Sequence, residues 1–84
     1  MKHKIEIAPL LNYYVIAVKD KETGDLVETF TLNESGTDML RLFCQDKDAA
    51  TVAQEIAEMY EAPLELVTKD VSAFAEKLQK KGLI

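Results

Sequence analysis

The sequence predicts an α+β fold in which a small antiparallel sheet of three strands precedes three α-helices. In the first part of the chain, apolar and polar residues alternate with the period of two that is typical of strands. In the second part, apolar residues recur at the spacings of three and four that are typical of helices. With 84 residues the chain suffices for one modest core, so we expect residues 1–84 to form a single domain.

Two segments of the first part have clear strand character. Residues 13–19 are rich in β-branched and aromatic types, and residues 26–32 alternate regularly. The polar segment 20–25 between them suits a hairpin turn, and a shorter strand is expected over residues 4–8, just before Pro9. One face of the segment 26–32 is predicted to hold four residues: Leu26, Glu28, Phe30 and Leu32.

Capping residues mark the first two predicted helices. Asn33 is a favourable N-cap for a helix that ends near Cys44, and Gly36 in its first turn indicates the close approach of another backbone or helix. Either Asp48 or Thr51 can cap the second helix. The residues of the second helix that we expect to be buried lie on one face: Val52, Ile56, Met59 and Tyr60.

The third predicted helix is the longest. It starts at Pro63 or Leu64, because proline disfavours helical geometry in the residue before it. Gly82 suits the left-handed position that ends a helix, and we expect Leu83 and Ile84 to fold back onto the core. The spacing predicts a core stripe on this helix: Val67, Val71, Phe74 and Leu78.

Charge and composition argue against several classes of function. The net charge of −5 disfavours binding to nucleic-acid phosphates, and Arg41 is the only arginine in the chain. No apolar run is long enough to span a membrane and no secretory signal is recognisable, so a cytoplasmic protein is expected. The single cysteine, Cys44, cannot form an intramolecular disulfide, and we expect it to be a small core residue.

The sequence contains no recognisable set of catalytic residues. Ser35 and Ser72 have only His3 as a histidine base, and we expect His3 to lie in a mobile terminus. Three scattered glycines cannot form a phosphate-binding loop, and a single histidine with a single cysteine makes a metal site improbable. We therefore expect no catalytic residue, no metal and no cofactor, and a protein that works by binding rather than as an enzyme.

Two binding modes follow from the predicted elements. Helices beside a β-hairpin form an arrangement like a winged helix, which suggests a regulator that contacts DNA or another protein through its third helix. Alternatively, the strand over residues 26–32 has Glu28 as its only charge and lacks the lysine or proline that protects sheet edges. Such an edge can accept an extended peptide as an added strand, unless a partner strand or the N-terminal segment covers it. The residues alone do not decide between these binding modes, or whether the strand edge is covered.

Four spaced motifs resemble the PqqD family, which is named for the biosynthesis of pyrroloquinoline quinone. The motifs are LNESGTDML at 32–40, TVAQEIA at 51–57, DVSAF at 70–74 and GLI at 82–84. The chain departs from the family pattern at two places. The segment 45–50 lacks the usual glycine turn, and Ala75 replaces the leucine that commonly follows the phenylalanine.

This resemblance implies a winged helix-turn-helix domain that recognises peptides. Members of the family bind the leader of a ribosomally synthesised precursor peptide and present it to a modifying enzyme, often of the radical S-adenosylmethionine type. The leader would add to the third strand, with its side chains in the groove beside the third helix, where Lys69 and Lys77 could read acidic residues. The corresponding strand positions are Val27, Glu28, Thr29, Phe30 and Thr31. The corresponding helix positions are Leu66, Lys69, Asp70, Ala73 and Lys77.

Overall fold

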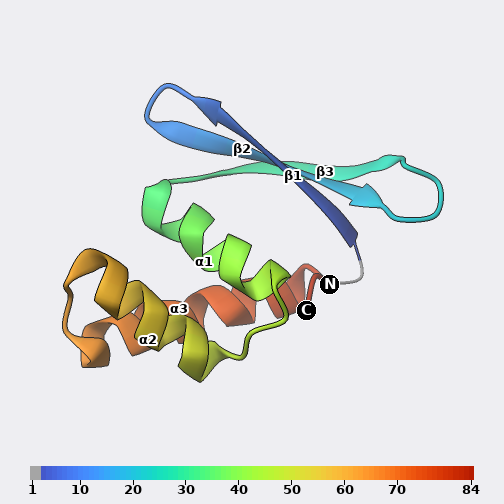
Figure 1. The fold of residues 1–84 in the computed structure, drawn as a ribbon. Helices are drawn as coiled ribbons and strands as arrows, with labels where there is room; N and C mark the ends of the chain where they lie inside the picture. Colours follow the sequence, from blue (N-terminus) through green and yellow to red (C-terminus); the bar gives the residue numbers. More distant parts are fainter. Residues whose placement is uncertain (1–2) are drawn as a thin grey trace.

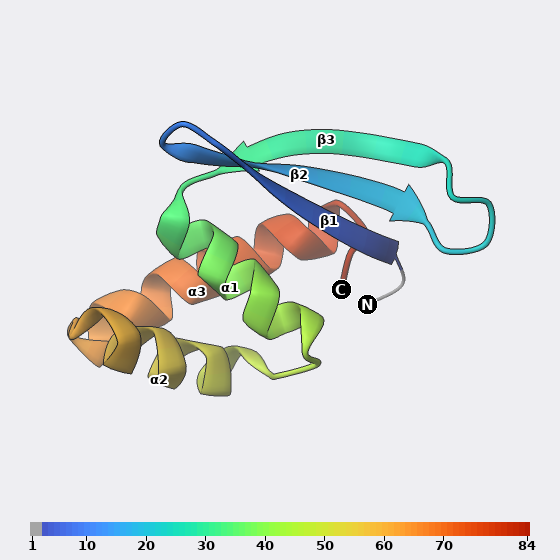
Figure 2. The same cartoon turned by 45° about the horizontal axis from the view of Figure 1, so that its top comes forward.

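The computed structural model describes residues 3–84 and contains three strands followed by three helices (Figure 1). These elements are β1 (His3–Leu10), β2 (Tyr13–Asp20), β3 (Leu26–Leu32), α1 (Glu34–Cys44), α2 (Ala49–Tyr60) and α3 (Leu64–Lys80). The strands form one antiparallel sheet in the order β1-β2-β3, and the helices lie on one side of it (Figure 2). The predicted α+β fold is confirmed.

β1 is longer than the sequence predicted. It begins at His3, which lies opposite Asp20 on β2, so His3 belongs to the sheet and not to a mobile terminus as expected. The strand also continues through Pro9, which lies opposite Tyr14. Proline is tolerated there because β1 is an edge strand, where a missing backbone N–H can face away from the ladder.

A bulge in β3 overturns the predicted position of Leu26. Lys19 lies opposite Leu26 and Val18 lies opposite Glu28, so Val27 is an extra residue in the ladder. The bulge turns Leu26 to the same side as Lys19, away from the helices, and Leu26 is 59% exposed. Glu28, Phe30 and Leu32 share one face of β3, as predicted, and this face is turned toward the helices.

The caps explain where the helices begin. The backbone N–H of Gly36 donates to Oδ1 of Asn33 at 2.9 Å, and the backbone N–H of Thr51 donates to Oδ1 of Asp48 at 2.8 Å. Asp48 is therefore the N-cap of α2. A Cβ at Gly36 would lie 3.1 Å from Oδ1 of Asn33 and 3.5 Å from the Leu32 side chain. The glycine makes room for this cap, so the expected approach of another backbone or helix was wrong.

The core lies between the three helices and the inner face of the sheet. Its buried apolar residues are Ile16, Val18, Met39, Leu40, Phe43, Val52, Ala53, Ile56, Val67, Val71, Leu78 and Leu83. Phe74 is partly buried against this core. No helix within residues 3–84 has the length and the apolar character that crossing a membrane requires.

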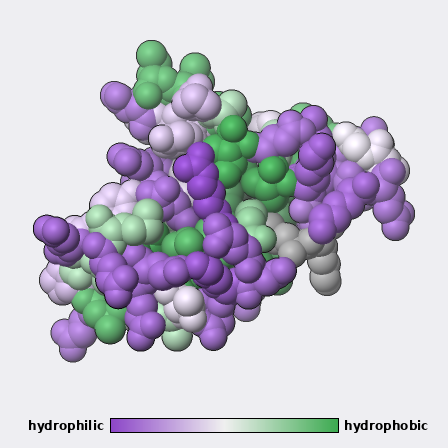
Figure 3. Space-filling view, viewed as in Figure 1, coloured by the Kyte–Doolittle hydropathy of each residue, from purple (hydrophilic) through white to green (hydrophobic). Residues whose placement is uncertain are grey.

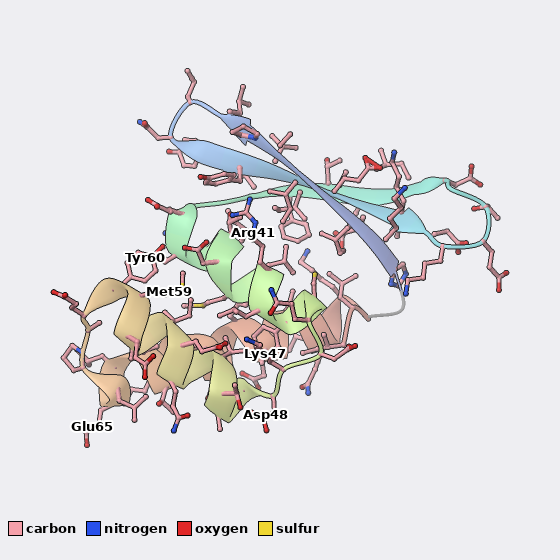
Figure 4. All side chains as sticks on the ribbon, in the orientation of Figure 1. Arg41, Lys47, Asp48, Met59, Tyr60 and Glu65 are labelled. Carbon is pink, nitrogen blue, oxygen red and sulfur yellow. The ribbon has the colours of Figure 1, made fainter. Side chains whose placement is uncertain are left out.

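Three residues expected in the core lie outside it. Met59 is 56% and Tyr60 is 39% exposed, because the last turn of α2 extends to a corner of the molecule near the start of α1 (Figure 4). There the Tyr60 hydroxyl donates to Oδ2 of Asp38 at 2.5 Å. Cys44 is also exposed, since it is the last residue of α1 and precedes the exposed turn that leads to α2.

After the end of α3, the chain reverses direction and packs back onto the core. Gly82 has the left-handed φ of +74°, and its N–H donates to the carbonyl of Gln79, while the N–H of Leu83 donates to the carbonyl of Leu78. This pair of hydrogen bonds is a Schellman motif, as the glycine predicted. The chain therefore turns back and buries Leu83, although Ile84 remains 42% exposed.

Candidate functional site

The two edges of the sheet differ in their chemistry. The edge strand β1 contains Lys4, Glu6 and Pro9, and Nζ of Lys19 on β2 lies 2.8 Å from Oε1 of Glu6. Charged residues and proline are typical of edges that resist pairing with another strand. The opposite edge strand, β3, contains only one charged residue, Glu28, and this side chain faces the helices. β3 is therefore the edge that is open to a further strand.

The C-terminal end of α3 lies beneath the first half of β3. Nζ of Lys81, the residue that follows α3, lies 3.2 Å from Oε2 of Glu28 and 4.7 Å from the centre of the Phe30 ring. These contacts cover the inner face of β3 at that end. In Figure 2, α3 passes behind α1 beneath the sheet, so that α1 and α3 together face the inner side of β3.

A cleft of about 350 Å³ opens where the end of β3, at Leu32, meets α1 and α3. We call it the β3–α3 cleft. Its lining residues are Leu32, Asn33, Ser35, Gly36, Met39, Asp70, Ala73, Phe74 and Lys77. The apolar residues Leu32, Met39 and Phe74 are buried or partly buried, whereas Asp70 and Lys77 are exposed. The cleft thus combines an apolar base with charged rims and lies beside an open sheet edge.

The structure divides the helix positions that the family resemblance implied. Asp70, Ala73 and Lys77 line the β3–α3 cleft. Leu66 and Lys69 instead line a separate hollow of about 500 Å³ at the start of α3. The two groups therefore belong to different surfaces.

The five strand positions lie on both faces of β3. Thr29 and Thr31 are exposed on the outer face, opposite Ala17 and Val15 of β2. Glu28 and Phe30 face the helices, where Lys81 contacts both. Val27 is exposed in the bulge.

Sequence reasoning did not assign the base of the cleft to the site. Phe74 was placed in the core stripe of the third helix, and its partly buried position agrees with packing against the core. Leu32 was read only as a strand residue. A signal existed in the position of Leu32 directly before the helix cap Asn33, because the end of an edge strand is where a neighbouring groove can open.

Other surfaces are less suited to an extended peptide. A larger hollow of about 580 Å³ lies between the α1–α2 turn and the end of α3, with Phe43, Ala75 and Leu83 in its lining, but no strand borders it. Hydrophobic atoms also gather at the end of the β1–β2 hairpin (Figure 3), where Leu11 is 95% exposed. Within residues 3–84, no group of three or more His, Cys, Asp or Glu side chains could hold a metal ion.

Comparisons with known proteins agree with this architecture. No curated protein matches the sequence. A solved structure described as "TbiB1 in Complex with the TbiA(beta) Leader Peptide" has the same fold, with a TM-score of 0.69 over 99% of this chain and 93% of that chain, at 22% identity. The family model of "Coenzyme PQQ synthesis protein D (PqqD)" matches residues 19–84, which is well over half of the sequence. The chain therefore belongs to the PqqD family.

Proposed function

We propose that this protein is a non-catalytic module that binds the leader of a ribosomally synthesised precursor peptide. The proposal rests on one observation, the open edge of β3 beside the apolar β3–α3 cleft. Membership of the PqqD family supports it, and so does the fold shared with TbiB1, whose structure is described as holding a leader peptide. In this proposal, residues 1–84 act as one recognition domain.

Binding would extend the sheet by one strand. Backbone groups on the outer edge of β3 would pair with the backbone of the peptide, and every second peptide side chain would point to the helices. The bulge at Val27 interrupts regular pairing, so we expect continuous hydrogen bonding only beyond it, from Glu28 to Leu32. One apolar side chain of the peptide would occupy the β3–α3 cleft.

The second partner would be a peptide-modifying enzyme, for which the family resemblance favours the radical S-adenosylmethionine type. A module without catalytic groups of its own can contribute to such a reaction by raising the local concentration of the precursor at the enzyme. We place this step in the cytoplasm, where ribosomes supply the precursor.

A titration of backbone amide NMR signals tests the proposal. Adding a candidate leader peptide should shift the amides of residues 28–32 on β3 and those of Ala73 and Lys77 on α3. If those signals stay unchanged while duplex DNA shifts the amides of α3, the protein is instead a winged-helix regulator.

A paired substitution tests the position of the site. Ala73→Trp should fill the β3–α3 cleft and weaken leader binding at least tenfold, because Ala73 lines this cleft and the indole would occupy the space of the peptide side chain. Ala50→Trp is the matched control, since Ala50 is also an exposed helical alanine but lies on α2 outside the cleft. Equal affinities for the two variants, measured by calorimetry, would contradict this site.

A further inference from the structure

We infer that the β3–α3 cleft selects an alternating pattern in the leader: an apolar residue with a basic residue two positions to one side and an acidic residue two positions to the other. This inference rests on the proposed function and adds the chemistry of the bound segment. It follows from the two charged rims of the cleft, from their order along α3 and from the spacing between them.

Opposite charges stand at the two ends of the cleft. Asp70 and Lys77 are exposed, and both line the cleft with Ala73 between them. Among residues 3–84, neither side chain takes part in any hydrogen bond or ion pair. Both charges are therefore available to a ligand.

The contacts of α3 place these charges relative to β3. Lys81, after the end of the helix, contacts Glu28 and Phe30, whereas the earlier residues Asp70 and Ala73 share the cleft with Leu32. The helix thus runs antiparallel to β3. The acidic rim lies toward the end of the strand, and the basic rim lies toward its middle.

The backbone N–H groups at the start of α1 do not offset the negative charge of Asp70 at the acidic rim. A helix N-terminus attracts anions through its unpaired backbone N–H groups, and Ser35 and Gly36 line the cleft. The Asn33 side chain already occupies one of these backbone donors, because its Oδ1 accepts from the Gly36 N–H at 2.9 Å, and the same oxygen accepts from the Ser35 hydroxyl at 3.3 Å. Asp70 is consequently the charged group at this end of the cleft.

The distance between the rims fits every second residue of a strand. Asp70 and Lys77 are seven positions apart on α3, which corresponds to about 10 Å along the helix axis. Residues i−2 and i+2 of an extended peptide lie about 13 Å apart, and flexible side chains cover the difference. Residue i would then point between the rims at the apolar base formed by Leu32, Met39 and Phe74.

Lys69 does not belong to this pattern. It lines the separate hollow at the start of α3 together with Leu66, and it is not among the residues that line the β3–α3 cleft. Of the two lysines that the family resemblance suggested for reading acidic residues, only Lys77 meets the bound segment in this inference. Lys69 therefore provides a matched control.

Two synthetic peptides of identical composition test the inference. Both are extended host peptides rich in threonine and valine, with Lys-Thr-Leu-Thr-Glu at the centre of one and Glu-Thr-Leu-Thr-Lys at the centre of the other. In fluorescence anisotropy at low salt, the full chain should bind one of them about three- to tenfold more tightly, as expected for two exposed ion pairs. The preference should shrink in high salt.

Charge-exchanged variants identify the residues responsible. Asp70→Lys combined with Lys77→Asp should reverse the preference, whereas Lys69→Glu should leave it unchanged. Because all these positions are exposed, circular dichroism should show an unaltered fold. Three results would overturn the inference. They are equal affinity of the wild type for both peptides, no binding of the wild type to either peptide, and a double variant that keeps the preference of the wild type. The NMR titration with a leader judges strand addition separately, so shifts at β3 without charge preference would leave the proposed function standing.

Discussion

At the scale of single residues, the N-cap Asp48 makes the stability of the start of α2 depend on pH. Hydrogen bonds from the backbone N–H and the hydroxyl of Thr51 lower the pKa of Asp48 below its ordinary value of 3.8. A lowered pKa means that the carboxylate stabilises the folded state above the ordinary pKa, and this stabilisation is lost as the pH falls through the folded value. The cap should therefore weaken in acid.

Asp48→Asn should reduce the acid sensitivity of the protein. Asparagine still accepts a hydrogen bond at an N-cap but carries no charge to titrate. We expect urea unfolding midpoints to fall less between about pH 5 and pH 2 in this variant than in the wild type. Some loss should remain, because hydrogen bonds from the backbone of Thr23 and Glu22 also lower the pKa of Asp20. An unchanged pH profile would contradict the role of Asp48.

Tyr60 has the opposite pH dependence. Burial and the nearby Asp38 carboxylate, which accepts its hydroxyl hydrogen, raise the pKa of Tyr60 above the ordinary value of 10.0. The unfolded state then loses this proton at a lower pH than the folded state, so stability should fall as the pH rises above about 10. Tyr60→Phe should flatten this decline in alkaline denaturant titrations. Tyr13→Phe, at an exposed tyrosine of β2, is the control and should leave the decline in place.

Several residue positions could not be predicted because they depend on contacts beyond local periodicity. Strict alternation placed Leu26 on the same face as Phe30 and Leu32, and a single extra residue at Val27 put it on the opposite face. Met59 and Tyr60 share the apolar face of α2 in sequence, yet the last turn of that helix passes beyond the core. Periodicity indicates which face of an element is apolar, but it does not indicate how much of that face a neighbour covers.

At the scale of elements, boundaries were predictable because local chemistry determines them. Asn33 and Gly82 act through hydrogen bonds and backbone angles within a few residues, and both performed their predicted roles. Two choices needed the structure: Asp48 or Thr51 as the second N-cap, and Pro63 or Leu64 as the start of α3. β1 was underestimated since Pro9 suggested an end, although an edge strand accommodates proline.

Gly82→Ala tests the end of α3. A Cβ at this position would meet no atom within 4 Å, so steric crowding by neighbours is absent and only the φ of +74° opposes the substitution. We expect a loss of about 1 kcal/mol in the free energy of unfolding, which is the cost of left-handed geometry for a residue with a Cβ. Gly24→Ala is a matched control with a φ of +77° and equally open space, in the β2–β3 turn. Both variants should lose a comparable amount of stability. Hydrogen exchange of the amides at the end of α3 should become faster in Gly82→Ala and stay unchanged in Gly24→Ala.

At the scale of the whole molecule, the β3–α3 cleft was the part least accessible to sequence reasoning. Its base combines Leu32 at the end of a strand with Met39 and Phe74 from two different helices. The open edge of β3 could be anticipated from its lack of lysine and proline. The relative placement of α1 and α3 could not, because packing between elements determines it.

Leu83 and Ile84 allow a matched test of how the last residues complete the core. Leu83 is 1% exposed, so Leu83→Ala should lower the free energy of unfolding by about 2–5 kcal/mol through the cavity that it leaves. Ile84 is 42% exposed, and Ile84→Ala should cost clearly less. Denaturant titrations measure both values. Similar losses would show that Leu83 is not a core residue in solution.

The contact between Lys81 and Glu28 also has a consequence for the order of folding. Strands that are neighbours in the sheet are neighbours in sequence, so the sheet can form through local contacts that close quickly. In contrast, Lys81 and Glu28 are 53 residues apart, and joining them requires a much larger loop to close. The two walls of the cleft should thus meet late, after the sheet and the helices have begun to form. A partly folded chain would present the β3 edge before it has the cleft that confers selectivity, and would be at its most prone to pair with the wrong strand.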